Sequence, residues 1–212
     1  YNKGNDAIQA LKQGKVDAVV IDIQPAKAFT EANSDLTILE EEFVNEDYAL
    51  CISKSRPELK ASINEAIRAL KENGTLDNIL KNYIGEDAGK TPYVTPEGTE
   101  HSNGTLVMAP NAYFKPYEYY EGGKIVGIAV DMATAIADYL GMNLKIEDME
   151  FDSIITAVQS GKADFGAAGM TVTPERLKNI DFSDTYTTSQ QVIVVRDNNA
   201  IGANSNIIEK FK

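Results

Sequence analysis

The chain has 212 residues, of which 43% are hydrophobic and 25% are charged, so it is long enough for one large or two small domains with a buried core. Acidic residues outnumber basic residues by 32 to 20, and the formal net charge is −12. A field of that sign repels phosphate backbones and anionic lipids, so we expect neither nucleic acid nor a membrane surface as a partner.

Three further features of the sequence exclude other classes of protein. The apolar stretches are shorter than the ~20 residues of a membrane-spanning helix, and the polar residues 1–6 do not resemble a signal peptide. The single cysteine, Cys51, excludes an internal disulfide, and the single histidine, His101, leaves no cluster of histidines and cysteines for zinc. We therefore expect neither a bound metal nor another cofactor.

The first predicted element is a helix over residues 5–14, because apolar side chains recur on one side and Gly14 suits a left-handed C-terminal cap. A nearly all-apolar strand over residues 16–21 follows the helix. This composition is typical of a strand that is covered on both faces in a parallel sheet.

This passage from helix to strand has a second copy later in the chain. At one constant offset, Ile8, Ala10, Gly14, Lys15 and Asp17 match Ile155, Ala157, Gly161, Lys162 and Asp164. Each copy ends a helix at glycine, turns through lysine and begins a strand next to aspartate. The repeat indicates two related lobes, although a common helix-to-strand turn explains each copy taken alone.

Two more helices are predicted in the middle of the chain. The first begins near Pro57, carries apolar residues at helical spacing and stops at residues 73–74, and Thr75 can cap the second. Residues 86–103 contain two prolines, two glycines and hardly any aliphatic residue, which is the composition of a linker.

An apolar strand at residues 106–109 then begins what resembles the start of a domain. After it the sequence predicts, in order, a turn at residues 121–124, a helix from about Asp131 to Leu140 ended by Gly141, and strands around residues 144–146 and 191–195.

Several motifs in both parts of the chain resemble those of one protein family. They are NAYFKPY at residues 111–117, GIAVD at 127–131, AGMTVTPER at 168–176 with IDFSD at 180–184, and GKVDAVVID at 14–22. In these motifs residues 104–195 resemble the N-terminal lobe, and residues 1–85 the C-terminal half, of bacterial amino-acid-binding proteins of ABC transporters. The resemblance implies an α/β type II periplasmic-binding-protein fold, with two lobes that each have a central, mostly parallel sheet flanked by helices.

The order of the two halves is inverted relative to that family, which indicates a circular permutation or the junction of two tandem binding domains. We assign residues 1–47 to part of the smaller lobe 2, 48–85 and 104–192 to lobe 1, 86–103 to a linker, and 193–212 to the hinge and the start of lobe 2. The Gly-Thr-rich loop that opens the family's second lobe is not found. We therefore expect part of lobe 2 to be missing, with segment exchange or a homodimer to complete it.

The resemblance also implies a ligand site for an α-amino acid. The residues expected to contact the ligand are Arg176, Thr171, Gly169, Asp22, Asn111, Phe114, Phe151 and Ala168. Arg176 suits the ligand carboxylate because its planar fork donates two parallel hydrogen bonds, and by resemblance Asp22 of the other lobe pairs with the ammonium. Ligand binding would then favour a closed arrangement of the lobes.

Each of these roles has an alternative that the sequence leaves open. Arg176 suits a solvated position in the first turn of a helix, and Asp22 suits the cap of the helix that starts near Gln24. Phe114 and Phe151 suit the core as well as the site. By resemblance Cys51 lies in a strand that crosses between the lobes, where a buried, unreactive thiol is expected.

The side-chain specificity follows from two neutral positions. Relatives that take basic or amide side chains often carry an acid at the positions of Asn111 and Ala129, and both residues are neutral here. Nothing evident would neutralise a cationic side chain, while Lys115 tolerates an acidic or amide one. We therefore favour glutamine or another polar neutral amino acid.

These observations favour a non-enzymatic binding protein, periplasmic or extracellular and lipid-anchored in a Gram-positive source, that delivers an amino acid to an ABC-transporter permease. One alternative is a permuted or engineered binding protein with partial or no ligand binding. Another is a dehydratase on the same fold, since related enzymes act on small carboxylic acids. Such an enzyme needs a protonatable group over its substrate, and only Asp22 offers one, so we expect no catalytic residue.

Overall fold

The computed structural model describes residues 1–39, 44–86 and 88–197. These residues fall into two compact units. Unit 1 contains the described residues of the range 1–46 together with residues 188–197, and unit 2 contains the described residues of the continuous stretch from Asp47 to Thr187. None of the helices in the described ranges is both long enough and apolar enough to cross a membrane.

Unit 1 is built on a sheet with the strand order β1-β12-β2, in which β3 also pairs with β12. Its elements are α1 (Gly4–Lys12), β1 (Ala18–Asp22), α2 (Ile23–Ala32), β2 (Leu36–Ile38), β3 (Val44–Tyr48) and β12 (Thr187–Arg196). The predicted first helix and strand are both present, with bounds shifted by one or two residues. Helix α1 buries Ile8 and Leu11, which lie one turn apart on its apolar face.

The prediction that β1 lies in a parallel sheet is wrong. β1 runs antiparallel to β12, from the pair Ala18 and Val195 to the pair Asp22 and Gln191. An apolar run shows that side chains on both faces are packed, but it does not report the direction of the neighbouring strand. Even this packing is incomplete on β1, since Val20 is 39% exposed.

The repeated passage from helix to strand adopts the same turn in both copies. Gly14 and Gly161 have positive φ angles of 70° and 76°. The amide of Lys15 donates to the carbonyl of Ala10 over 2.9 Å, and the amide of Lys162 donates to that of Ala157 over 2.9 Å. The first copy belongs to unit 1 and the second to unit 2.

Unit 2 is built on a five-stranded sheet with the order β11-β4-β10-β5-β9. The strands are β4 (Cys51–Ile52), β5 (Thr105–Ala109), β9 (Asn143–Ile146), β10 (Phe165–Gly166) and β11 (Asp181–Phe182). β5 is parallel to both β9 and β10, whereas β4 is antiparallel to β10 and β11. This sheet confirms the predicted strands at residues 106–109 and 144–146.

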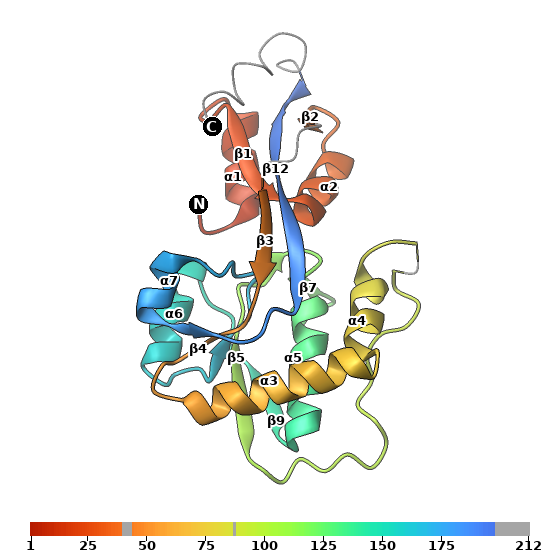
Figure 1. Ribbon diagram of the computed structural model, residues 1–212. Helices are drawn as coiled ribbons and strands as arrows, with labels where there is room; N and C mark the ends of the chain where they lie inside the picture. Colours follow the sequence, from red (N-terminus) through yellow and green to blue (C-terminus); the bar gives the residue numbers. More distant parts are fainter. Residues whose placement is uncertain (40–43, 87, 198–212) are drawn as a thin grey trace. The chain divides into compact units, whose positions relative to one another are not determined.

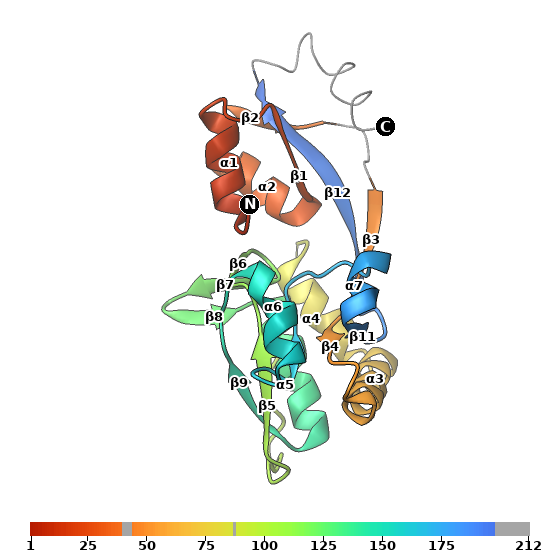
Figure 2. The same cartoon turned by 90° about the vertical axis from the view of Figure 1, so that its left-hand side faces the viewer.

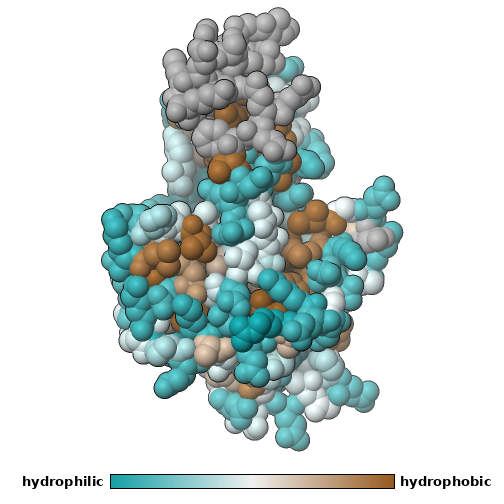
Figure 3. Space-filling view, viewed as in Figure 1, coloured by the Kyte–Doolittle hydropathy of each residue, from teal (hydrophilic) through white to brown (hydrophobic). Residues whose placement is uncertain are grey.

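Helices cover both faces of this sheet (Figures 1 and 2). Alternate strand residues point to opposite faces: Met108 packs in a cluster with α3 (Pro57–Glu72), α4 (Thr75–Tyr83) and α5 (Ile128–Leu140), and Ala109 packs in a second cluster with α6 (Phe151–Gln159). On the face of unit 2 drawn in Figure 3, hydrophilic side chains predominate and hydrophobic ones form separate patches. Apolar side chains of α3, α4 and α5 pack in one of these clusters, and those of α6 pack in the other.

The predicted start of α3 and the predicted end of α5 are confirmed, whereas α5 begins at Ile128, three residues before the predicted Asp131. α3 begins at Pro57, and α5 ends at Gly141, which has a φ of 65°. Thr75, however, does not cap α4, because it is the first helical residue and the cap position is Gly74 in the left-handed conformation. The side chain of Asn73 accepts the amide of Thr75 over 2.9 Å instead.

A small antiparallel sheet follows β5. It consists of β6 (Tyr113–Phe114), β7 (Glu118–Glu121) and β8 (Lys124–Val126), with β7 in the middle. The predicted turn between β7 and β8 is present, and it uses Gly122 and Gly123 at φ angles of 57° and 79°. Positive φ is accessible to glycine at little cost, so the pair closes the hairpin tightly.

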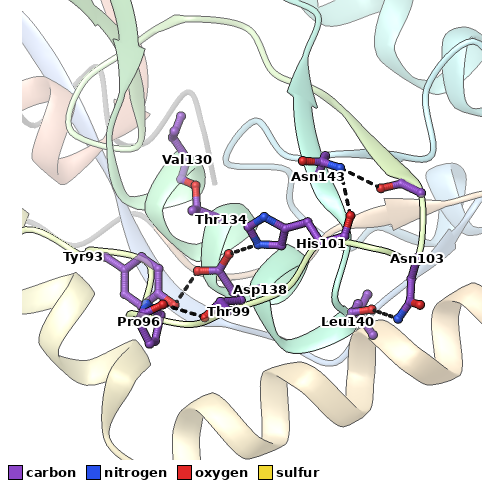
Figure 4. A network of polar contacts seen from close by, with 11 residues as sticks. Tyr93, Pro96, Thr99, His101, Asn103, Val130, Thr134, Asp138, Leu140 and Asn143 are labelled. Atoms are coloured by element: carbon purple, nitrogen blue, oxygen red, sulfur yellow. Dashed lines mark hydrogen bonds and ion pairs between the residues drawn. The ribbon is translucent and has the colours of Figure 1, made fainter.

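The segment with linker composition is fastened to unit 2 rather than left free (Figure 4). The phenol of Tyr93 donates to one carboxylate oxygen of Asp138 on α5 over 2.9 Å, and Nε2 of His101 lies 2.7 Å from the other. The side chain of Asn103 donates to the carbonyl of Leu140 over 2.8 Å, at the end of α5. The segment is therefore poor in aliphatic residues and is held to unit 2 by polar contacts.

We expect Asp138→Ala to destabilise unit 2 by about 1–3 kcal/mol, because it removes the shared partner of Tyr93 and His101. Burial, and then the hydrogen bond to Asp138, raise the pKa of Tyr93 well above its ordinary 10.0. Because the pKa of this phenol is raised in the folded protein, the contribution of Tyr93 to stability is fully present below its ordinary pKa. This contribution is lost as the pH rises from there through the raised pKa. Urea unfolding measures the loss, and ultraviolet titration of tyrosine should show one phenol ionising at lower pH in the variant. An unchanged titration would show that Asp138 does not hold Tyr93.

Candidate functional site

The candidate site lies at the carboxyl ends of the parallel strands of unit 2. The chain passes from β5 to β9 on one side of β5, and then through α6 to β10 on the other side. The strand order therefore reverses between β5 and β10, which end at Ala109 and Gly166. In open α/β sheets, ligands bind outside the carboxyl ends of the strands at such a reversal.

Seven of the eight predicted site residues belong to unit 2, and most follow directly from these strand ends. Asn111 and Phe114 come after β5, Phe151 begins the helix after β9, and the rest lie in or near the loop after β10. The members of that last group are Ala168, Gly169, Thr171 and, on α7 (Pro174–Asn179), Arg176.

Phe114 and Gly169 lie against each other. The ring of Phe114 stacks on that of Tyr117 with centroids 5.6 Å apart and planes inclined by 21°. A Cβ atom at Gly169 would come within 2.7 Å of Cε1 of Phe114, and Gly169 has a φ of 52°. The glycine therefore permits both the turn after β10 and the position of the aromatic ring.

We expect Gly169→Ala to weaken ligand binding more than it weakens the fold. The added methyl group must displace the half-buried Phe114 ring, and the positive φ adds a strain of roughly 1–3 kcal/mol. Calorimetric titration and thermal unfolding on the same sample separate the two effects. An affinity equal to that of the unmodified protein would remove the Phe114 ring from the site.

The structure brings Arg176, Thr171 and Phe151 together. Nη1 of Arg176 donates to the carbonyl of Thr171 over 2.9 Å, and the guanidinium carbon lies 5.3 Å from the centroid of the Phe151 ring. The hydroxyl of Thr173 caps α7 by accepting the amide of Arg176 over 3.2 Å. The guanidinium is thus held over the loop after β10 instead of extending into solvent.

Among the seven predicted site residues of unit 2, Asn111 and Ala168 are the most deeply buried. Asn111 is 6% exposed, and its side-chain amide donates to the carbonyl of Met149 over 2.9 Å. Ala168 is 4% exposed and packs in the apolar cluster that contains Met170 and α6 residues. Asn111 therefore ties two loops together, and Ala168 packs against the second layer of the unit.

Asp22 belongs to unit 1, where it caps α2. Its Oδ1 accepts the amide of Gln24 over 2.9 Å, and its Oδ2 accepts the hydroxyl of Ser189. The capping contact left open by the sequence is therefore present, and the role toward a ligand ammonium stays a prediction. Ser189 on β12 was not singled out from the sequence, because a lone serine in a polar stretch carries no spacing signal.

Cys51 is fully buried beside Gly166, and burial raises the pKa of its thiol to about 12. A thiol with that pKa is protonated at neutral pH and is a poor nucleophile. Within residues 1–39, 44–86 and 88–197, no three histidine, cysteine or acidic side chains gather as a metal site would require.

Comparison with known proteins adds the family context. The sequence profile of the bacterial extracellular solute-binding proteins, family 3, matches residues 2–86 and 106–210. The arginine-binding extracellular protein ArtP of Bacillus subtilis is 43% identical over 104 residues, which are 49% of this chain and 41% of ArtP. A probable histidine-binding protein of Neisseria gonorrhoeae is 34% identical over 89 residues, 42% of this chain and 33% of that protein.

A solved structure, the arginine-bound form of domain 1 from TmArgBP, is 37% identical over 52% of this chain and 90% of that one, with a TM-score of 0.39. The chain spans about two fifths of the length of ArtP and a third of the Neisseria protein.

Proposed function

Since the chain belongs to the bacterial extracellular solute-binding proteins of family 3 and has their type II periplasmic-binding-protein fold, we propose that it captures a polar L-amino acid for uptake by an ABC transporter. The observation that carries the proposal is the placement of Arg176 beside Thr171 and Phe151 at the carboxyl ends of the unit 2 strands. A guanidinium held there suits a carboxylate, because its fork donates two parallel hydrogen bonds.

The two charges of the ligand would be bound by different units. Arg176 binds the carboxylate, with the Thr171 hydroxyl as a further donor and the Gly169 carbonyl as an acceptor for the ammonium. Asp22 of unit 1 supplies the counter-charge for the ammonium, since a desolvated charge needs a paired group. A ligand that gains contacts with both units favours their closure, and the closed form is the one that docks to a permease.

The side chain of the ligand is proposed to be polar and neutral, with glutamine favoured. Asn111 is neutral and its amide is engaged by Met149, while Ala129 is fully buried in the core. The names of relatives such as ArtP refer to arginine. Arginine is therefore the alternative ligand, and binding measurements must distinguish it from glutamine. Phe114 and Phe151 would pack on the aliphatic part of either side chain.

We propose a binding protein rather than an enzyme. The dehydratase alternative needs an acid or base over the substrate, and among the eight predicted contact residues Asp22 is the candidate. Both oxygens of Asp22 already accept protein donors, from Gln24 and Ser189, so this carboxylate is engaged within unit 1.

The proposal includes the inverted order of the two halves, through either permutation or a tandem junction. The family profile matches two separate stretches, 2–86 and 106–210, which flank the fastened segment, and this supports two joined halves. The rest of lobe 2 would come from further chain or from a second copy by segment exchange. We also propose that the protein is located in the periplasm or at the cell exterior, where it would carry a lipid anchor. The molecular mass in solution tests whether a second copy is bound.

Isothermal titration calorimetry with each of the twenty L-amino acids tests the function. We expect saturable binding of glutamine, weaker binding of arginine, and no heat from an analogue of glutamine that lacks the α-amino group. Tighter binding of arginine would overturn the glutamine preference alone. Absence of binding for all twenty would overturn the proposed function, and turnover of a cyclic hydroxy acid would favour the enzyme.

A further inference from the structure

One acidic residue next to the candidate site is not among the residues predicted to contact the ligand. Asp148 follows β9 in the loop that leads to α6, and its two carboxylate oxygens accept from two different segments. Oδ1 accepts the backbone amide of Ala112 over 2.8 Å, and Oδ2 accepts the phenol of Tyr120 over 3.0 Å. One side chain therefore joins the loop after β5 to the middle strand of the β6-β7-β8 sheet.

The backbone around Asp148 is itself anchored to the loop after β5. The amide of Glu147 donates to the carbonyl of Met108 over 2.9 Å, and the amide of Met149 donates to that of Pro110 over 3.1 Å. The pairing of β5 and β9 thus continues past the ends of both strands. Asp148 projects its carboxylate from a fixed frame, which a residue in an unattached loop would not do.

The two contacts of Asp148 bracket the residues expected to meet the ligand side chain. Ala112 lies between Asn111 and Phe114, and Tyr120 lies on β7, which pairs with β6 through Phe114 and Glu118. Fixing Ala112 and Tyr120 fixes both ends of the hairpin that carries Phe114. Gly169 packs against the Phe114 ring, which leaves little room for the ring to shift.

We propose that Asp148 is a positioning residue of the amino-acid site: it sets the loop of Asn111 and the hairpin of Phe114, and so determines how well the side chain of the ligand is discriminated. This inference rests on the proposed function, because it assigns Asp148 to the same site. In this proposal Asp148 acts through Asn111 and Phe114 and does not itself contact the ligand.

A carboxylate suits this role better than other side chains of its size. It offers two acceptor oxygens, and both donors, an amide N–H and a phenol O–H, need an acceptor. Asparagine keeps one acceptor oxygen and replaces the other with an NH₂ group. The hydrogen bond to Asp148 is also the main reason that the pKa of Tyr120 is raised, so this phenol reports on the contact.

The test compares Asp148→Ala, Asp148→Asn and the matched control Glu147→Gln. Glu147 is the neighbouring acid, and its carboxylate pairs with Lys145 over 2.7 Å, so the control removes one negative charge beside Asp148 without freeing either segment. We expect Asp148→Ala to speed amide hydrogen exchange over residues 110–120 of the ligand-free protein and to lower the pKa of Tyr120. Binding of the preferred amino acid should weaken by about 10-fold, with a reduced preference over other amino acids.

Asp148→Asn should retain the contact with Ala112 and give intermediate values, and Glu147→Gln should behave like the unmodified protein. Unchanged exchange over residues 110–120 in Asp148→Ala overturns the inference whether or not the protein binds amino acids. Faster exchange with unchanged preference among ligands also overturns it, because the contact would then serve stability alone. Failure of the proposed function is distinguished by the unmodified protein, which would bind none of the amino acids.

Discussion

Arg176→Ala is expected to abolish measurable amino-acid binding while the protein still unfolds cooperatively. Truncating one partner of a desolvated charge pair costs ~2–5 kcal/mol of binding free energy, because the carboxylate is left without its counter-charge. The stability of the fold should change little, because the guanidinium donates to the Thr171 carbonyl in the loop after β10 and takes no part in the sheet. Titration calorimetry and thermal unfolding measure the two quantities.

The matched variant for Arg176 is Arg176→Lys, which keeps the charge and loses the planar fork. We expect it to bind more weakly than the unmodified protein and more tightly than the alanine variant, because a single ammonium cannot donate the two parallel bonds. Equal affinities in the alanine variant and the unmodified protein would show that Arg176 is a surface residue, as its place in the first turn of α7 allows.

Gly127→Ala is expected to destabilise unit 2 by about 3 kcal/mol or more, because the added methyl group meets backbone atoms and the φ angle is positive. A Cβ atom at Gly127 would lie 2.3 Å from the carbonyl oxygen of Tyr117, and Gly127 has a φ of 132°. That carbonyl cannot move aside freely, because it accepts the amide of Ala129 over 2.9 Å. Chemical denaturation measures the loss.

Gly104→Ala separates backbone strain from the steric clash. Gly104 also has a positive φ, 98°, but a Cβ atom there would meet no atom within 4 Å. We expect this variant to lose about 1 kcal/mol, since it suffers strain alone. Similar losses in both variants would mean that the contact with Tyr117 relaxes easily and that the start of α5 is not fixed.

The sequence predicts well those parts of the fold that depend on local signals. The helix from Pro57, the end of α5 at Gly141 and the Gly122–Gly123 hairpin follow from residues whose conformational preferences are strong. The strand direction of β1 could not be predicted, because pairing with β12 joins residues from opposite ends of the described chain. An apolar run carries no information about a partner so distant in sequence.

The candidate site divides in the same way. The motif around Arg176 brought out the residues after β10, and the structure places Arg176, Thr171 and Phe151 together. The contacts of Asp148 and Ser189 were missed, because an isolated acid or hydroxyl in a polar loop or strand has no pattern to reveal it. The composition of residues 86–103 does not indicate that Tyr93 and His101 share Asp138. These contacts depend on the packing of α5.

The division of the chain between the units has a consequence for folding order. Unit 2 is one uninterrupted stretch, whereas the sheet of unit 1 joins β1 near the beginning of the chain to β12 near the end of the described residues. During synthesis β1 leaves the ribosome long before its partner exists, so the contiguous unit can form first and the split one must wait. The interval exposes an unpaired apolar strand, and the nascent chain is then most vulnerable to aggregation.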